Sequence, residues 1–242
     1  MNYVISDIHG CYKEYQKLLE KIHFSDTDVL YLLGDMVDRG PEPVKVLQDV
    51  MLRSNVYPIL GNHDYMAWKV LSRFAVEITE RNAETQLRTE DLMNYMHWSQ
   101  DGGSVTAQQF RKLDAEERQD ILDYLADCSI FEDIFVNGNR FVLAHADIHG
   151  FSEERDLEDY DISDFLFYRA QYQKRYFSGE HNFLVTGHTP TMMIREDGKP
   201  LVYQGNGHIG LDCGCVYGGK LAAYCLDTQE ITYVDAEQNY DP

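Results

Sequence analysis

Short apolar runs that end in polar residues recur along this chain. The first three runs cover residues 3–5, 29–33 and 56–60. The first two lead into segments whose apolar residues recur at three- and four-residue spacing, which is typical of an amphipathic helix. Strand and helix alternating in this way predict right-handed crossovers and a mostly parallel sheet, and therefore an α/β fold.

The two helices expected between these strands begin differently. Residues 12–21 carry Tyr15, Leu18 and Leu19 on one face and predict the first helix. Proline suits the first turn of a helix, so Pro41 is expected to begin the second, whose apolar face includes Val44.

A long stretch without a strand pattern follows the third strand. Between about residues 65 and 128 we expect a helical insertion, with helices at 66–78, 90–98 and 115–126. Gly102-Gly103 is interpreted as an ordinary turn between helices rather than a contact with substrate. An insertion at this place is expected to flank the functional site and to influence which substrates enter.

The second half of the chain returns to short apolar segments. Residues 130–136 and 141–144, joined through Asn137-Gly138-Asn139, predict a hairpin. A helix is expected over about 162–176, followed by a strand at 183–186. The remaining segments favour a second, more antiparallel sheet and lie at 209–215, 221–226 and 231–234.

The polar residues that end the apolar runs predict one shared site. Ligands bind beyond the carboxyl ends of parallel strands, so these side chains are expected to converge. The ends of five runs supply Asp7, His9, Asp35, Asn62, His145 and His188. Residues 147–150 repeat the Asp-Ile-His-Gly sequence of residues 7–10, which makes His149 an alternative ligand. His145 is preferred because it directly follows a strand.

The types of side chain in this set indicate a metal centre. Carboxylate oxygen, amide oxygen and imidazole nitrogen without thiolate suit manganese, iron or zinc, and manganese is favoured. Six ligands exceed one tetrahedral ion but fit two divalent ions that share a carboxylate, and Asp35 in the middle strand is the expected bridge. Two such ions lower the pKa of a bound water from 15.7 to about 7 and hold an anion beside it.

Length and charge limit the other possibilities. The chain has 242 residues without a Pro- or Gly-rich linker, and we expect one domain over 1–242. A net charge of −20 argues against nucleic-acid and anionic-membrane partners. The first strand begins at Tyr3, which leaves no room for a signal peptide, and no segment has about 20 apolar residues. We expect a cytoplasmic protein.

The cysteines are interpreted as reduced thiols. Their number, five, is odd, and a chain of this size does not need disulfides for stability. Cys213-Gly214-Cys215 has neither the spacing nor the partner pair of a zinc site, so these cysteines are interpreted as alternating residues of a strand.

The motifs and their order resemble those of the calcineurin-like metallophosphoesterases. Asp-x-His-Gly stands at 7–10, Gly-Asp-x-x-Asp-Arg-Gly at 34–40, Gly-Asn-His-Asp at 61–64 and Gly-His at 187–188. The tripeptide Asp-Arg-Gly at 38–40 is similar to the phosphoprotein phosphatase branch, and the segments at 145–147, 187–190 and 211–214 resemble its bacterial and phage serine/threonine phosphatases. The resemblance covers nearly the whole chain and implies a four-layer α/β/β/α sandwich with a helical insertion.

The resemblance also implies a role for each site residue. One metal ion would be held by Asp7 and His9 and a second by Asn62, His145 and His188, with Asp35 bridging. His63 would be the general acid, kept protonated by Asp38. Substrate phosphate would be bound by Arg39, Arg169 and Asn62. Arg169 departs from the family pattern, which has tryptophan where this chain has Phe167.

Three hypotheses of function follow. The first is a metal-dependent phosphomonoesterase, similar to serine/threonine protein phosphatases, in which a metal-bridging hydroxide attacks phosphorus directly. Its partner would be a phosphorylated protein or peptide, or a small phosphate ester. The alternative is a symmetrical diadenosine tetraphosphate hydrolase, because that family resembles this chain in its helical insertion and in a Leu-Asp-x-Gly-Cys ending. The third is a binding module without catalysis.

Overall fold

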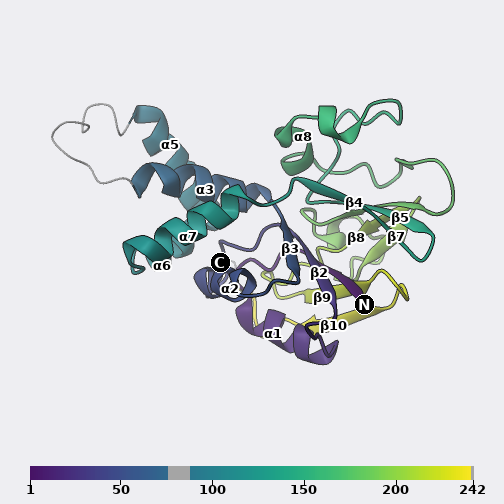
Figure 1. Cartoon of the computed structure of the whole chain (residues 1–242), viewed down its shortest axis with the longest axis horizontal. Coiled ribbons are helices and arrows are strands. Elements are labelled where there is room, and N and C mark those ends of the chain that lie inside the picture. The colour runs from purple at the N-terminus through teal and green to yellow at the C-terminus, as the bar shows by residue number, and fades with distance from the viewer. Residues whose placement is uncertain (76–87, 241–242) are drawn as a thin grey trace.

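Two five-stranded sheets packed face to face form the centre of the molecule, as seen in the computed structural model (Figure 1). The structure describes residues 1–75 and 88–240. The strand order is β10-β9-β1-β2-β3 in the first sheet and β4-β5-β6-β8-β7 in the second. Helices and loops cover the outer face of each sheet, which confirms the expected α/β fold with layers in the order α/β/β/α.

The first sheet is built around the three expected parallel strands. These are β1 (Asn2–Ile5), β2 (Val29–Leu33) and β3 (Val56–Ile59), and they are connected by α1 (Tyr12–Lys21) and α2 (Pro43–Met51). The helix over 12–21 is confirmed to the residue. The second helix begins at Pro43 rather than Pro41, because the Glu42 N–H donates to the Gly10 carbonyl and holds the chain outside the helix.

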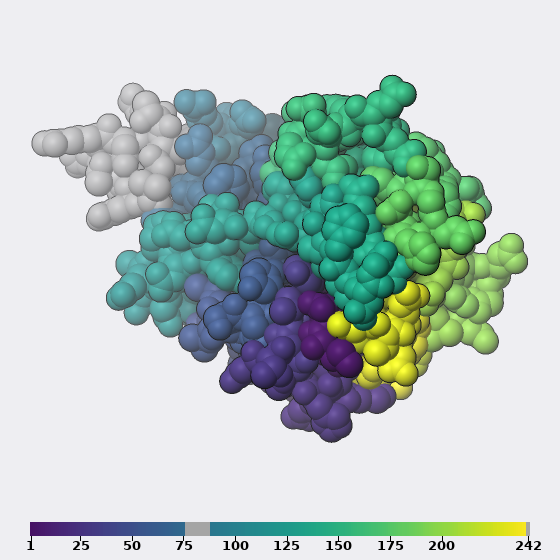
Figure 2. Space-filling view, turned by 45° about the vertical axis from the view of Figure 1, so that its right-hand side comes forward, coloured from purple at the N-terminus to yellow at the C-terminus, as the bar shows by residue number. Residues whose placement is uncertain are grey.

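The C-terminal strands are divided between the two sheets, which corrects the expectation that they form one sheet of their own. β9 (Lys220–Cys225) and β10 (Ile231–Asp235) continue the first sheet, where β9 lies antiparallel to β1. Figure 2 shows purple N-terminal residues next to yellow residues from the C-terminal part of the chain, in agreement with this pairing. An unpaired β1 edge would leave backbone groups without partners, and β9 supplies them.

The second sheet is mixed. β5 (Asn139–Ala144), β6 (Asn182–Thr186) and β8 (His208–Gly210) are parallel, with β4 (Phe131–Val136) and β7 (Tyr203–Gly205) antiparallel at the edges. The 137–139 turn joins β4 and β5 as expected. The short strand β7 was not expected from the sequence.

Alternation along the strands decides which residues face the other sheet. In β2, Leu33 packs between the sheets with Phe141 and Val185 of the second sheet, whereas Leu30 and Leu32 face the helical side. The outer face of the second sheet is covered by a separate cluster that includes Phe165. The parallel strands of both sheets are therefore buried on both faces, and their polar ends meet at one edge.

The helical insertion follows β3 directly. It contains α3 (Asn62–Phe74), α5 (Thr89–Trp98), α6 (Ser104–Phe110) and α7 (Ala115–Ala126). The helix over 115–126 is confirmed, α6 was not expected, and α3 begins four residues earlier than its apolar pattern indicates. Positions 76–78 of the expected helix lie outside the described residues. Among the described helices, none is long and apolar enough to cross a membrane.

Two local expectations are wrong. The helix expected over 162–176 ends early, as α8 (Ile162–Leu166), because the Tyr168 carbonyl accepts a hydrogen bond from Asp147 N–H and turns the chain towards the site. Cys213-Gly214-Cys215 is a turn rather than a strand, since Gly214 has a φ of 67°. The five cysteines are free thiols.

Gly34 is expected to be indispensable for bringing the strand ends together. Its φ is 75°, and an added Cβ would lie 2.4 Å from Gly61 Cα and 2.8 Å from His145 Nδ1. Gly138 has a φ of 83° but nothing within 4 Å, so it provides a control for backbone strain alone. We expect Gly138→Ala to cost about 1–2 kcal/mol in unfolding free energy. Gly34→Ala should cost about 2 kcal/mol more, measured by chemical denaturation; equal costs would contradict this packing.

Candidate active site

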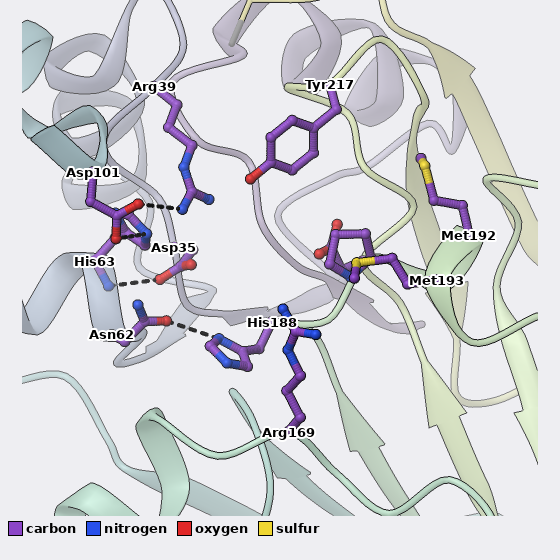
Figure 3. A pocket seen from close by; sticks show the side chains of 12 residues that line it. Asp35, Arg39, Asn62, His63, Asp101, Arg169, His188, Met192, Met193 and Tyr217 are labelled. Carbon is purple, nitrogen blue, oxygen red and sulfur yellow. Dashed lines mark hydrogen bonds and ion pairs between the residues drawn. The ribbon is translucent and has the colours of Figure 1, made fainter. Parts of the chain in front are cut away.

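The polar strand ends converge beside one pocket, which Asp35, Asn62 and His188 line directly (Figure 3). The backbone has an unusual conformation at several of the residues that supply these side chains. Positive φ angles between 43° and 70° occur at Asp7, His9, Asp35, Asp38, Arg39 and His188. For residues other than glycine this conformation costs about 1–3 kcal/mol each, so strain is concentrated at this site.

Two buried imidazoles face the carboxylate of Asp35. His9 Nδ1 donates to the Val37 carbonyl at 2.9 Å, and His145 Nδ1 donates to the Leu33 carbonyl at 2.7 Å. Because a carbonyl can only accept, both rings keep an Nε2 lone pair. His9 Nε2 lies 3.4 Å from Asp35 Oδ2, and His145 Nε2 lies 3.5 Å from Asp35 Oδ1. Metal-binding histidines in proteins are typically oriented by a partner at the other ring nitrogen.

Asn62 connects the second imidazole with a third. Its Oδ1 lies 2.9 Å from His145 Nε2 and 3.0 Å from His188 Nδ1. Burial lowers the pKa of His145, and burial together with the neighbouring His145 lowers the pKa of His188 to about 3. These neutral rings and the amide oxygen therefore offer lone pairs to a common point.

Two further acids increase the negative charge of the site. Asp7 accepts hydrogen bonds from the His188 backbone N–H at 3.1 and 3.0 Å. Burial, followed by the charges of Asp212 and Asp35, raises the pKa of Asp7 well above its ordinary value. Burial also raises the pKa of Asp212 to about 7. Buried carboxylates in such numbers require compensating positive charge.

The residues present fit divalent metal ions. Oxygen and nitrogen donors form two triplets that share Asp35, namely His9 with Asp35 and His63, and Asp35 with His145 and His188. Within each triplet the ligand atoms lie within 4.8 Å of one another. Cations between these lone pairs would relieve the repulsion among them. The structure thus brings the sequence-derived set together and adds His63 to its neighbourhood.

His63 and Asp38 form a buried pair beside this cluster. His63 Nδ1 donates to Asp38 Oδ2 at 2.8 Å. Burial lowers the pKa of His63, but the charge of Asp35 and the bond to Asp38 outweigh it and raise the pKa above its ordinary value. Asp38 also accepts from Trp98 Nε1 at 2.7 Å and from Thr106 Oγ1 at 2.6 Å. Both donors belong to the helical insertion, and neither polar role was expected from the sequence.

The insertion reaches the site at a kink. Gly102 has a φ of 97°, and its carbonyl accepts from the Arg39 backbone N–H at 3.0 Å. Asp101, 54% exposed, pairs with Arg39 Nη2 at 3.2 Å and lies 3.6 Å from His63 Nε2. Residues 102–103 are therefore more than a turn between helices, because this kink holds the phosphate-binding candidate Arg39.

Arg39 and Arg169 lie on different sides of the same cavity (Figure 3), which has a volume of about 390 Å³. Arg39 Nη1 donates to His9 Nε2 at 2.8 Å. Arg169 comes from the loop after α8, where the expected helix is absent. His149 is exposed and stacks on Tyr168 with ring centroids 3.7 Å apart, outside both metal-binding triplets.

Asp64 supports the site although it does not line the cavity. Its carboxylate accepts from the backbone N–H groups of Met36, Val37 and Gly61. It thereby ties the segment after β2 to the start of α3. The Gly-Asn-His-Asp motif contains this residue, but only the folded structure shows that Asp64 holds the backbone in place and does not bind a ligand.

A mixed α/β fold with neighbouring carboxylate and imidazole groups that could hold two metal ions is typical of metal-dependent phosphoester hydrolases. The sequence model of the calcineurin-like phosphoesterases matches residues 3–234, so the chain belongs to this family. Members of the family use divalent metal ions, and the expected family and enzyme class are confirmed.

Several similar proteins are named for dinucleotide hydrolysis. A symmetrical bis(5'-nucleosyl)-tetraphosphatase of Buchnera aphidicola subsp. Schizaphis graminum is 38% identical over 50% of this chain and 43% of its own length. The chain thus spans less than half of that relative. The asymmetrical bis(5'-nucleosyl)-tetraphosphatase PrpE of Bacillus subtilis is 27% identical over 98% of this chain and 96% of its own length.

Solved structures agree on the fold. A crystal structure provisionally described as a diadenosine tetraphosphatase superposes with a TM-score of 0.64 at 21% identity, covering 97% of this chain and 93% of the other. A serine/threonine protein phosphatase from Saccharomyces cerevisiae gives a TM-score of 0.53 at 11% identity, over 98% and 79% of the two chains. At these identities the likeness concerns the fold alone.

Thr106 is expected to stabilise the protein through Asp38. Its hydroxyl donates to Asp38 Oδ1 and accepts from Asp38 N–H at 3.0 Å. Thr106→Val keeps the shape but leaves buried polar groups without partners, which should cost about 1–3 kcal/mol in unfolding free energy. Chemical denaturation with chelator present measures this, with the exposed Thr27→Val as control. A loss no larger than that of the control would contradict the role of the hydroxyl.

Proposed function

We propose that this protein hydrolyses dinucleoside tetraphosphates. The observation that carries the proposal is a pocket in which arginines lie on different sides of the metal-binding cluster. Arginine binds phosphate oxygens in a bidentate manner, and guanidinium groups on different sides of the cavity could hold more than one phosphate group of a polyphosphate. The names of the relatives support the same substrate class, which is the alternative among the three hypotheses of function.

The metal ligands are assigned as the sequence indicated. Asp7 and His9 would hold one divalent ion, and Asn62, His145 and His188 a second, with Asp35 shared between them. The two Asp35 oxygens face different imidazoles, which supports the bridging role. When bound, such ions would supply an activated water and neutralise charge on the phosphate. Manganese remains our proposal for the ion, with iron or zinc as alternatives.

Side chains of the protein would protonate the leaving group and hold the substrate phosphates. His63 is raised in pKa, which suits a general acid that protonates the leaving phosphate oxygen. Asp38 would orient the imidazole through Nδ1, so that Nε2 is the nitrogen that donates to the leaving oxygen. Arg39 and Arg169 would hold nonbridging phosphate oxygens, with the Asn62 amide nearby. These roles are the ones that the family resemblance implies.

A phosphoprotein substrate is the competing hypothesis, because Asp38-Arg39-Gly40 is similar to the phosphoprotein phosphatases. No similarity reported above favours it beyond the fold. The two hypotheses are distinguished by comparing turnover of diadenosine tetraphosphate with turnover of a phosphothreonine peptide and of para-nitrophenyl phosphate.

The experiment uses manganese-loaded protein and identifies products by chromatography. The proposal expects kcat/KM for the dinucleotide to exceed that for the peptide by about tenfold or more. Symmetrical cleavage gives ADP alone, and asymmetrical cleavage gives ATP with AMP. Peptide turnover above dinucleotide turnover would overturn the proposal. The chelator-treated protein is the control and should lose turnover of all three substrates.

The acid role of His63 predicts a pH dependence. Activity should fall as pH rises through the pKa of His63, because the proton needed by the leaving group is lost. The bond to Asp38 raises that pKa, so Asp38→Asn should move the alkaline limb of kcat/KM to lower pH, by about 1 pH unit or more. Asp133→Asn, which alters a surface pair with Arg140, is the control. If the alkaline limb of kcat/KM lies at the same pH in Asp38→Asn as in wild type, the His63–Asp38 hydrogen bond does not have this catalytic role.

A further inference from the structure

The cavity continues beyond the groups that could bind phosphate. On the side away from His63 and Asp101 its wall consists of Met192, Met193 and Tyr217 (Figure 3). Met193 is 59% exposed. Together these three side chains give the cavity an apolar wall, which a ligand bound in the cavity can contact.

Short, tightly bonded loops hold this wall in place. Met192 and Met193 belong to the 3-10 turn η3 (Thr191–Met193), in which the Met193 N–H donates to the Pro190 carbonyl at 2.8 Å. Met192 packs so closely on Gly214 that a Cβ there would lie 2.7 Å from its Cε. The wall therefore has a defined shape before any ligand arrives.

Tyr217 is fixed from the other side. Its backbone N–H donates to the Gly214 carbonyl at 3.1 Å, and the residue forms a β-bridge with Asn239. The Arg39 guanidinium lies 5.7 Å from the centroid of its ring. The ring thus stands between the phosphate-binding candidate Arg39 and the two methionines, as Figure 3 shows.

The chemistry of the wall differs from that of the metal cluster. Thioethers and an aromatic ring do not bind phosphate, but they pack against flat aromatic groups. We propose that Met192, Met193 and Tyr217 form a nucleoside subsite that takes the base of one substrate end. This inference rests on the proposed function, and it assigns the recognition of the nucleoside to residues that no phosphate monoester would need.

The size and position of the cavity agree with this occupant. A volume of about 390 Å³ lies within the range of roughly 300–1,000 Å³ found for small-molecule sites. Arg39 and Arg169 line the same cavity as the wall, so a polyphosphate held by either arginine leads directly to it. The alternative, that the wall only limits water around the metal cluster, predicts equal effects on all substrates.

The test compares Met193→Ala with wild type on diadenosine tetraphosphate and para-nitrophenyl phosphate. Loss of the thioether contact should raise KM for the dinucleotide by roughly threefold to tenfold, and the ratio of the two kcat/KM values should fall by a similar factor. Met96→Ala is the matched control, since Met96 is 57% exposed but lies on α5 outside the cavity lining. It should leave the ratio unchanged.

Tyr217 provides the second variant. Tyr217→Leu should lower the same ratio by about fivefold or more, and Tyr217→Phe, which keeps the ring, should restore most of it. Calorimetric binding of a methylene-bridged, uncleavable diadenosine tetraphosphate gives a readout besides turnover, with inorganic tripolyphosphate as the nucleoside-free probe. Selective weakening of the dinucleotide supports the subsite.

The nucleoside subsite and the proposed function can fail separately. If wild type cleaves the dinucleotide but both variants affect dinucleotide and aryl phosphate equally, the nucleoside subsite is wrong and the proposed function stands. If wild type does not cleave the dinucleotide, the proposed function is wrong and the subsite with it.

Discussion

The buried carboxylate of Asp35 is the constraint on which the rest of the structure depends. Its two oxygens face imidazoles from different sheets, His9 after β1 and His145 after β5. The sheets must therefore pack at one distance for the cluster to form. Gly34 and Gly61 allow it, because a Cβ on Gly61 would lie 2.3 Å from Asp35 Oδ1. The geometry of the site therefore depends on how closely the two sheets pack.

The features that suit this site to bind cations also lower the stability of the folded protein. Asp7, Asp35 and Asp212 are buried close together, and several site residues occupy strained backbone conformations. Such features destabilise a protein unless something compensates for them, and they are typical of sites that bind cations. Asp64 and the carbonyl partners of the histidines supply part of the compensation by fixing the backbone. Divalent ions would supply the positive charge that balances the buried carboxylates.

The local part of the fold was predictable, and the long-range part was not. The helices at 12–21 and 115–126 and the strand ends followed from apolar spacing, which depends on neighbouring residues. The pairing of β9 with β1 depends on residues more than 200 positions apart, and no local pattern records it. The set of candidate metal ligands could be predicted from the sequence because each member follows a strand. Trp98 and Thr106 reach Asp38 only through the folding of the insertion, so their roles required the structure.

The central claim is that Asp35 is shared by two metal ions, and the metal content of the purified protein tests it most directly. Wild type, Asp35→Asn and the surface control Asp133→Asn would be loaded with manganese, desalted and analysed by mass spectrometry. We expect two ions per chain in wild type and in the control, and fewer than two in Asp35→Asn. An Asp35→Asn protein that retains both ions as tightly as wild type would contradict the account.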